Sequence, residues 1–451
     1  MKNNPSWQAR LLWLGLAACA GPEQSPPTTL PQVIIEDVTV VDVVEGRLVP
    51  HTDVLITGER ITGLESHRHD RPVAAGGRVL DGRGKFLIPG LWDMHAHALW
   101  DRGAMTTFMP LYLSQGVTGV RDMGGTLALL KEARDSIAAG AWYPSVVGPG
   151  PIVDGPEPVQ REISVAVGDS TRARLVVDSL ADGGADFIKV YTLLPRAAFL
   201  AVLEEAARRH LAVVGHVPAD VTPEEAARLG MRSMEHLRDE IEPFCTRETP
   251  DACTPILREF KQHDVWQVPT LHVLRMKSLL DDSTLGQDPR MEFLMPSLRQ
   301  EWRSIQASRA GRGEAYFRGK RTRVQDEIWL AGLIFRDQGH LLAGTDAGVA
   351  FSYPGFSLHD ELALLAQAGL SPLDALRAAT SAPARFFGTE DSVGSIRPGL
   401  RADLVLLDQD PLANIAATKS IEAVVLRGRL FDRPALDSLL DSIRNANRDH
   451  D

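Results

Sequence analysis

This sequence of 451 residues has little of what defines several protein classes. Its three cysteines are too few to build a disulfide scaffold. The 48 Lys and Arg residues are outnumbered by 59 Asp and Glu residues, and the net charge of -11 leaves no basic footprint for nucleic acid. A mean hydropathy of -0.10 argues against a polytopic membrane protein. The remaining composition, 44% hydrophobic and 24% charged residues, is typical of a globular protein with a sizeable core.

The N-terminus has the pattern of an export signal. Lys2 and Arg10 provide positive charge beside an apolar stretch far shorter than the ~20 residues that a transmembrane helix needs. An ordinary signal peptide or a chance apolar run would also explain it. The stretch ends in Leu-Ala-Ala-Cys, which resembles the lipobox of bacterial lipoproteins. We therefore expect residues 1–18 to be removed, Cys19 to carry a lipid and residues 19–32 to form a tether. The protein would then be lipid-anchored in the cell envelope, facing the periplasm.

Export changes how the other two cysteines are interpreted. Cys245 and Cys253 lie eight residues apart in a segment rich in Pro, Thr and Asp. In an oxidising compartment such a pair favours a loop disulfide over two free thiols. No histidine lies between them, which disfavours a zinc knuckle. The sequence therefore predicts a Cys245–Cys253 disulfide.

Two β-rich segments flank a body in which strand and helix patterns alternate. Residues 33–86 and 391–435 are rich in short β-type runs, and we expect them to pair into one small composite β-sandwich. Between them, residues 87–390 hold eight strand candidates with helical stretches between several of them. This spacing predicts an α/β fold, namely a (β/α)8 TIM barrel. Residues 274–333 are charged and helical in pattern, and we expect them to form a helical insertion over one end of the barrel.

Polar residues in or at the ends of the predicted strands are the strongest functional signal. His95 and His97 lie two apart on the first strand, so both side chains point to the same face. A single histidine is usually a surface or core residue, and a buried lysine is usually paired with an acid. The joint pattern instead favours a site for zinc or a similar divalent ion at the carboxyl ends of the strands. Its six members are His95, His97, Lys189, His216, His236 and Asp346.

Two motifs give the chain a family resemblance. The run PGLWDMHAHA at residues 89–98 resembles the PG(L/F)xDxHxH signature of the amidohydrolase superfamily. The run GSIRPGLRADLVLL at residues 394–407 resembles the superfamily's GxIxxGxxADLVxL strand pair. The resemblance covers essentially the whole chain after the tether. Within the superfamily, the segments AVVGHVP, SMEHL and LLAGTDAG are similar to the prolidase-like and imidazolonepropionase-related branch.

The resemblance implies a binuclear centre of two divalent metal ions, most simply zinc. His95, His97 and Asp346 would hold one ion, and His216 and His236 the other. Lys189 would be carboxylated and bridge the two, because an unmodified ammonium donates hydrogen bonds and cannot coordinate. A hydroxide shared by the metals would attack the substrate carbonyl. Asp346 would accept its proton and pass it to the leaving amine.

Three further residues are weaker candidates for substrate contacts. Tyr191 faces the same side of its strand as Lys189, although packing within the barrel explains it as well. Arg121 on the second strand could meet an acidic substrate, but an ion pair with Asp122 or another acid is an equal alternative. His272 is a candidate for the rim of the pocket, as is His359.

One departure from the family pattern concerns specificity. Related dipeptidases carry a Gly-Gly-His stretch after the third strand, whereas this chain reads VVGPGPIVDGPEP there and has no histidine. The metal chemistry does not depend on that stretch, but dipeptide specificity of the known kind does.

The sequence therefore predicts a metal-dependent amidohydrolase that cleaves dipeptides or N-acyl amino acids. The same site also suits a cyclic amide, a lactone or a phosphoester, because fold and metal do not determine the substrate. A non-catalytic binding lipoprotein of the envelope is a remote alternative, since it would have lost ligands that are all present. The expected partners are a small molecule or short peptide, with no nucleic acid and no membrane contact beyond the lipid; a homo-oligomer is compatible with this.

Overall fold

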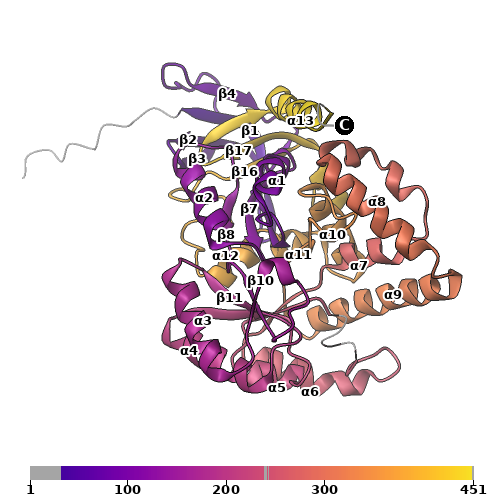
Figure 1. The fold of residues 1–451 in the computed structure, drawn as a ribbon. Helices are drawn as coiled ribbons and strands as arrows, with labels where there is room; N and C mark the ends of the chain where they lie inside the picture. The colour runs from indigo at the N-terminus through magenta and orange to yellow at the C-terminus, as the bar shows by residue number, and fades with distance from the viewer. Residues whose placement is uncertain (1–31, 238–240, 242, 449–451) are drawn as a thin grey trace, which may run out of the picture.

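The structure is a computed structural model that describes residues 32–237, 241 and 243–448 (Figure 1). The predicted export signal and the lipid-bearing Cys19 lie outside these residues. In the described part of the chain, no helix is long and apolar enough to cross a membrane.

Strands from the two ends of the chain lie in one mixed sheet (Figure 1). The sheet has the order β18-β17-β16-β5-β1-β2-β3, and β4 pairs with β1. Its strands are β1 (Val33–Asp42), β2 (Arg47–Thr57), β3 (Arg60–Ser66), β4 (Arg78–Asp81), β5 (Phe86–Pro89), β16 (Leu404–Leu407), β17 (Ile421–Leu426) and β18 (Arg429–Asp432). The two ends meet where β16 pairs antiparallel with β5, with Leu404 opposite Pro89. The strands alternate apolar residues, and their inner face buries a separate cluster that includes Ile35, Val54 and Leu404.

Two parallel sheets form the body of the chain. The larger has the order β10-β9-β11-β12-β13-β14-β15, and the smaller β6-β7-β8. Their strands are β6 (Leu91–Ala96), β7 (Val117–Asp122), β8 (Ser145–Val147), β9 (Ile152–Asp154), β10 (Ser164–Ala166), β11 (Phe187–Val190), β12 (Ala212–Gly215), β13 (Ser233–Glu235), β14 (Trp266–Val268) and β15 (His340–Leu341). Strands β6, β7, β11, β13 and β14 are buried along their whole length, as expected where helices cover a parallel sheet.

Backbone hydrogen bonds join the two parallel sheets at one side. The amide of Met94 in β6 donates to the carbonyl of Ala343, and the amide of Thr345 donates to the carbonyl of His95. The segment that follows β15 therefore lies against β6. The predicted α/β class is confirmed. The closed (β/α)8 barrel stays a prediction, because the paired strands among the described residues do not complete a ring.

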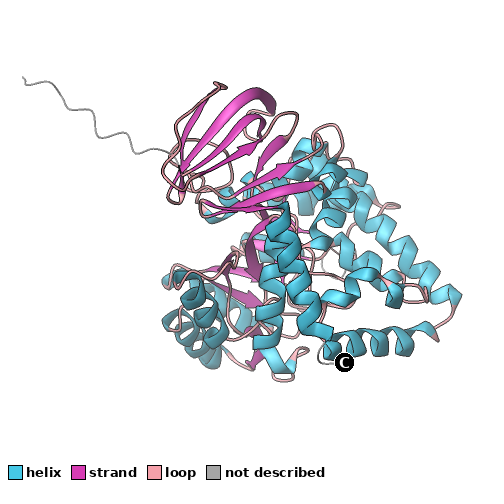
Figure 2. Cartoon of the chain, turned by 90° about the horizontal axis from the view of Figure 1, so that it is seen from above, coloured by secondary structure: helices cyan, strands magenta, loops and turns pink. Residues whose placement is uncertain are grey.

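Helices surround the parallel sheets (Figure 2). They are α1 (Arg102–Ser114), α2 (Leu127–Ala138), α3 (Ser170–Asp182), α4 (Arg196–Arg208), α5 (Pro223–Arg228), α6 (Cys253–Gln262), α7 (Leu271–Ser278), α8 (Pro296–Ala310), α9 (Glu314–Arg336), α10 (Phe356–Gln367), α11 (Pro372–Ala378), α12 (Ser381–Phe387) and α13 (Arg433–Arg448). Helix α3 shows the local rule: Asp169 caps its N-terminus by accepting from the amide of Arg172. Its buried residues Ala173, Val177 and Leu180 recur every three or four positions.

The segment 274–333 carries the helices α8 and α9. Trp302 of α8 is fully buried, and its ring lies 5.5 Å from the ring of Phe351 and 5.3 Å from that of Tyr353. These contacts attach α8 to the chain that follows Asp346.

The structure bonds Cys245 to Cys253, and both residues are 1% exposed. The bridge closes a short loop just before α6. Replacing both cysteines with Ser is expected to lower the free energy of unfolding by about 2 to 3 kcal/mol, because the unfolded chain regains the entropy of an open loop. Urea unfolding of the two proteins measures the difference. Equal free energies would mean that the bridge does not constrain the unfolded chain.

Candidate metal centre

Five strands and the turns after them carry the predicted ligands. His95 lies in β6 and Lys189 in β11, whereas His216 and His236 directly follow β12 and β13. Asp346 lies in the segment after β15 that bonds to β6. The strands β11, β12 and β13 are parallel neighbours, and the segment after β15 bonds to β6, so their carboxyl ends bring the residues together at one edge.

Two of these residues have unusual backbone conformations. His236 has a φ of 62° and Asp346 a φ of 57°, a left-handed region that residues other than glycine seldom adopt. Each is held by a hydrogen bond from its backbone amide. The amide of His236 donates to the carbonyl of Val268, and the amide of Asp346 donates to the carbonyl of His95. Strained conformations of this kind cost about 1 to 3 kcal/mol and cluster at functional sites. Here the two turns place the side chains of His236 and Asp346 in the lining of one cavity.

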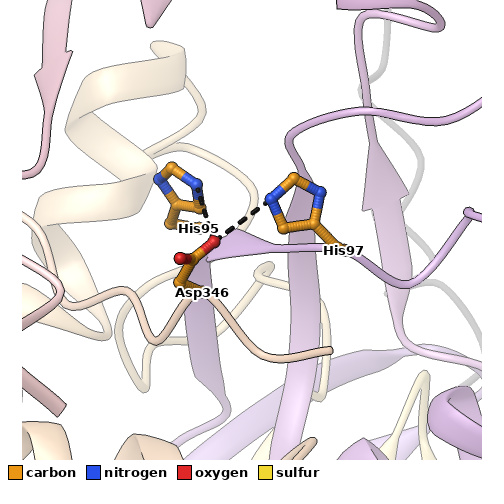
Figure 3. Close-up of side chains that lie close together, drawn as sticks. All are labelled: His95, His97 and Asp346. Carbon is orange, nitrogen blue, oxygen red and sulfur yellow. Dashed lines mark ion pairs between the residues drawn. The ribbon is translucent and has the colours of Figure 1, made fainter. Parts of the chain in front are cut away.

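One carboxylate oxygen faces two imidazole rings. Oδ1 of Asp346 lies 3.4 Å from Nε2 of His95 and 3.2 Å from Nε2 of His97 (Figure 3). The three side chains offer one ligand atom each, all within 4.8 Å of one another, and all three are buried. A carboxylate and two imidazoles at this spacing are a donor set suited to zinc or a similar divalent ion.

The histidines are oriented by hydrogen bonds at their other ring nitrogens. Nδ1 of His95 lies 2.8 Å from Oε2 of Glu235, and Nδ1 of His236 lies 2.6 Å from the hydroxyl of Thr270. Nδ1 of His216 lies 3.1 Å from the hydroxyl of Thr192. Such partners fix the ring so that Nε2 is the ligand atom.

The buried atoms of the site fit a metal ion. The Nε2 atom of His95 is buried and forms no hydrogen bond with the described residues. Buried polar atoms normally have a partner, and a bound cation would provide one. The rings of His95 and His236 lie 4.7 Å apart, and those of His216 and His236 lie 4.9 Å apart, so the second pair of histidines adjoins the first.

The charge states also suit coordination. Burial lowers the pKa of His95 to about 4 and lowers the pKa values of His216 and His236 well below their usual range. These imidazoles are therefore neutral near pH 7, as ligands must be. Burial alone would raise the pKa of Asp346, but His97 and the other histidines hold it well below its usual value, so this group is a carboxylate.

Lys189 and Tyr191 lie in the same cavity, whose volume is about 150 Å³. Lys189 is 1% exposed, and its Nζ atom lies 5.6 Å from the centre of the Tyr191 ring. That ring lies 3.9 Å from the ring of His216. The cavity is lined by His97, Trp100, Ile152, Gln160, Ile163, Lys189, Tyr191, His216, His236, Leu274, Lys277, Asp346 and Val349.

The structure does not bring the other two substrate candidates to this cavity. Arg121 is fully buried and donates to both carboxylate oxygens of Glu235 at 2.8 Å, so of its two predicted roles the structure shows the ion pair with another acid and not the substrate contact. His272 is 2% exposed and bonds to the hydroxyl of Ser357, so it is held in the interior by α10. His359 is likewise buried against Thr418. None of these three residues is therefore among those that line the cavity.

Two residues outside the cavity support it. Glu235 links Arg121 to His95, because its carboxylate lies 2.8 Å from Nδ1 of His95 and accepts from the guanidinium of Arg121 at 2.8 Å. Its place next to His236 in the sequence is the one signal that could have found it. Asp93 is buried and accepts from the amide of His95 and from the hydroxyl of Thr345, so it ties β6 to the segment of Asp346. Burial raises the pKa of Asp93 to about 7.

Comparison with known proteins finds similarity to amidohydrolases. Residues 314–431 match the model of the Amidohydrolase family. Ochratoxinase of Aspergillus niger is 24% identical over 318 residues, which cover 67% of this chain and 55% of the relative, so the match spans little more than half of that protein. A bottromycin amidohydrolase structure is 26% identical with a TM-score of 0.73 and covers 92% of this chain and 90% of its own. A Xaa-Pro dipeptidase structure with bound methionine in the active site has a TM-score of 0.67 at 18% identity and covers 89% and 99%.

These comparisons confirm the predicted similarity to the amidohydrolase superfamily. They also support the prediction that the chain is an amide-hydrolysing enzyme. The branch within the superfamily stays a prediction.

Proposed function

We propose that this chain is a metal-dependent hydrolase that cleaves an amide bond in dipeptides or N-acyl amino acids. The observation that carries the proposal is the cluster of His95, His97 and Asp346 beside a cavity that Lys189 and two further histidines also line. The similarity to amidohydrolases adds to it. The proposal places the chain in the prolidase-like and imidazolonepropionase-related branch, in a (β/α)8 barrel whose wall includes both parallel sheets.

The site has donors for two divalent ions. His95, His97 and Asp346 would hold one, and His216 and His236 the other, with Lys189 between them in carboxylated form. Such ions, when bound, polarise a carbonyl oxygen and lower the pKa of water. Lys189 must be carboxylated to act as a ligand, because an ammonium group offers no lone pair to a metal ion.

Asp346 is placed to move a proton. Its Oδ1 atom faces the two histidines, and its Oδ2 atom lies 3.8 Å from Nζ of Lys277, which also lines the cavity. The carboxylate is ionised, so it can accept a proton from water and deliver it to the nitrogen of the leaving amine. Tyr191 lines the same cavity, where its ring would orient the substrate.

Metal analysis and one substitution test this proposal. The purified protein should contain close to two divalent ions per chain, and a screen of N-acyl amino acids and dipeptides should find hydrolysis that a chelator removes. Asp346→Asn should lower kcat by about 10²- to 10⁴-fold, the usual contribution of a general acid–base, while part of the metal is kept. One ion per chain would refute the binuclear centre, and undiminished turnover in the Asn variant would refute the proton role of Asp346. Lactones, cyclic amides and phosphotriesters belong in the same screen.

We also propose that the protein works from the cell envelope. The support is the sequence of residues 1–19, with its positive start, short apolar stretch and lipobox-like end. Mass spectrometry of the mature N-terminus tests it: a lipid on Cys19 is expected, and an unmodified Cys19 would refute the anchor.

A further inference from the structure

A lysine that no part of the proposed mechanism uses lines the same cavity. Lys277 lies in the last turn of α7, and its side chain is 37% exposed, whereas the side chain of Asp346 beside it is 6% exposed. Its Nζ atom lies 3.8 Å from Oδ2 of Asp346. The ammonium therefore lies beside the carboxylate in the lining of the cavity and is the more exposed of the two groups.

The fold fixes the position of this lysine. The carboxylate of Glu361 in α10 accepts from the amides of Leu271 and His272 at 3.1 and 2.7 Å, and so holds the N-terminus of α7. Leu274, one turn before Lys277, lines the cavity as well. Because α7 is a single short helix anchored at its start, its cavity-facing side is set by packing and not by the lysine itself.

The chemistry of the lining indicates what this ammonium would meet. Apart from the metal-site residues and Lys277, the cavity wall is mostly apolar, with Trp100, Ile152, Ile163, Leu274 and Val349. Lys189 is the other lysine in the lining, and the proposed function uses it as a ligand. A small substrate with an apolar side chain and an anionic group fits this combination, because the apolar part is buried while the anion pairs with Lys277.

The position beside Asp346 says which part of the substrate carries the anion. In the proposed function, which this step rests on, Asp346 delivers a proton to the leaving nitrogen. In an amino acid the α-carboxylate is two bonds away from that nitrogen. A nitrogen within hydrogen-bond distance of Oδ2, roughly 3 Å, thus brings its own α-carboxylate within reach of Nζ of Lys277.

We propose that Lys277 binds the α-carboxylate of the amino acid that leaves, and so selects amides whose amine half is an amino acid with a free carboxylate. Lys277 is a specificity-determining residue in this account. Asp346 and Lys277 together recognise two groups of one product, namely the amine and the carboxylate on its α-carbon.

Paired substrates test this proposal. N-acetyl-leucine and N-acetyl-leucinamide differ only in the negative charge, and the wild type should prefer the free acid by about 10-fold or more in kcat/KM. Lys277→Met keeps an unbranched side chain that is one atom shorter and removes the charge. The preference should then fall to about 1, mainly through KM. The matched control is Lys131→Met on α2, because Lys131 is 75% exposed and pairs with Asp135 away from the cavity. An equal loss on both substrates would make Lys277 a structural partner of Asp346 and overturn the proposal.

A binding measurement separates this inference from the proposed function. In calorimetric titration of the metal-loaded protein, leucine should bind at least 10-fold more tightly than leucinamide to the wild type, and about equally to Lys277→Met. If neither substrate is hydrolysed but this difference is found, amide hydrolysis is refuted and the carboxylate anchor stands. If hydrolysis is found without any preference for leucine or for the free acid, the anchor is refuted and the proposed function stands.

Discussion

Lys189→Ala is expected to lower amide hydrolysis by about 10³-fold or more, because in the proposed function Lys189 would hold two metal ions that supply several kcal/mol of transition-state stabilisation. Lys189 lies on β11, is 1% exposed and lines the cavity with His216 and His236. An alanine there would remove the group that the proposed function assigns as the bridge. Steady-state kinetics and the metal content of the same preparation measure the loss.

A second substitution distinguishes a carboxylated lysine from a structural cation. Lys189→Arg keeps a positive charge but cannot be carboxylated, so it should be as inactive as Lys189→Ala. A short-chain carboxylic acid or bicarbonate should restore part of the activity of the Ala variant by supplying the missing carboxylate. Lys131→Ala, on the exposed face of α2, is the control and should be unaffected. Full activity and two metals in Lys189→Arg would refute carboxylation.

The candidate ligands could be identified in the sequence because each conflicts with its local environment. His95 and Lys189 are polar residues in strands that are buried along their whole length, and only a partner in the interior makes such positions stable. His216, His236 and Asp346 follow strands at the point where the chain turns. Their positions at the ends of predicted strands are therefore enough to indicate the edge of the sheet at which they meet.

The partners of these residues could not be predicted, because they depend on register across strands distant in sequence. Arg121 in β7 donates to Glu235 in β13, although these strands belong to different sheets. Strict strand alternation would put the side chains of Glu235 and His236 on opposite faces, but the positive φ of His236 breaks that alternation. The turn at His236 is therefore the reason why strand alternation does not locate both side chains correctly.

Lys277 was missed for a related reason. It lies in a segment that the sequence presents as a charged helical insertion, where one more lysine carries no signal. Only the packing of α7 beneath Glu361, and the turn that carries Asp346, place it in the cavity.

Glu235→Gln is expected to lower the free energy of unfolding by about 3 to 5 kcal/mol, because it leaves the guanidinium of Arg121 buried without its counter-ion. Both side chains are fully buried, and the carboxylate also accepts from Ser233 at 2.6 Å. Urea unfolding at pH 7 measures the loss. Arg121→Met should be comparably costly, whereas the double variant Arg121→Met with Glu235→Gln should recover most of it, since no unpaired charge remains. Two additive losses would contradict the pairing.

The same pair predicts a pH dependence with a defined sign. Burial would raise the pKa of Glu235, but Arg121 and His95 outweigh it and lower the pKa to about 2. The folded state therefore binds its proton less readily than the unfolded state, whose value is near 4.5. This contribution, about 3 kcal/mol, is complete above pH 4.5 and is lost as the pH falls towards 2. Glu235→Gln should remove that part of the acid sensitivity; Glu204→Gln, at an exposed ion pair with Arg174, should not.

Metal affinity connects this buried pair to the site. In Glu235→Gln, Nδ1 of His95 faces an uncharged amide, so the ring loses the carboxylate that orients it and raises its basicity. Such losses typically weaken metal binding by about 10- to 100-fold. Competition with a chelator of known affinity measures the change, with Glu204→Gln as the control. If stability falls while metal affinity is unchanged, Glu235 serves only to neutralise Arg121; if both fall, one carboxylate stabilises the core and orients His95 at the same time.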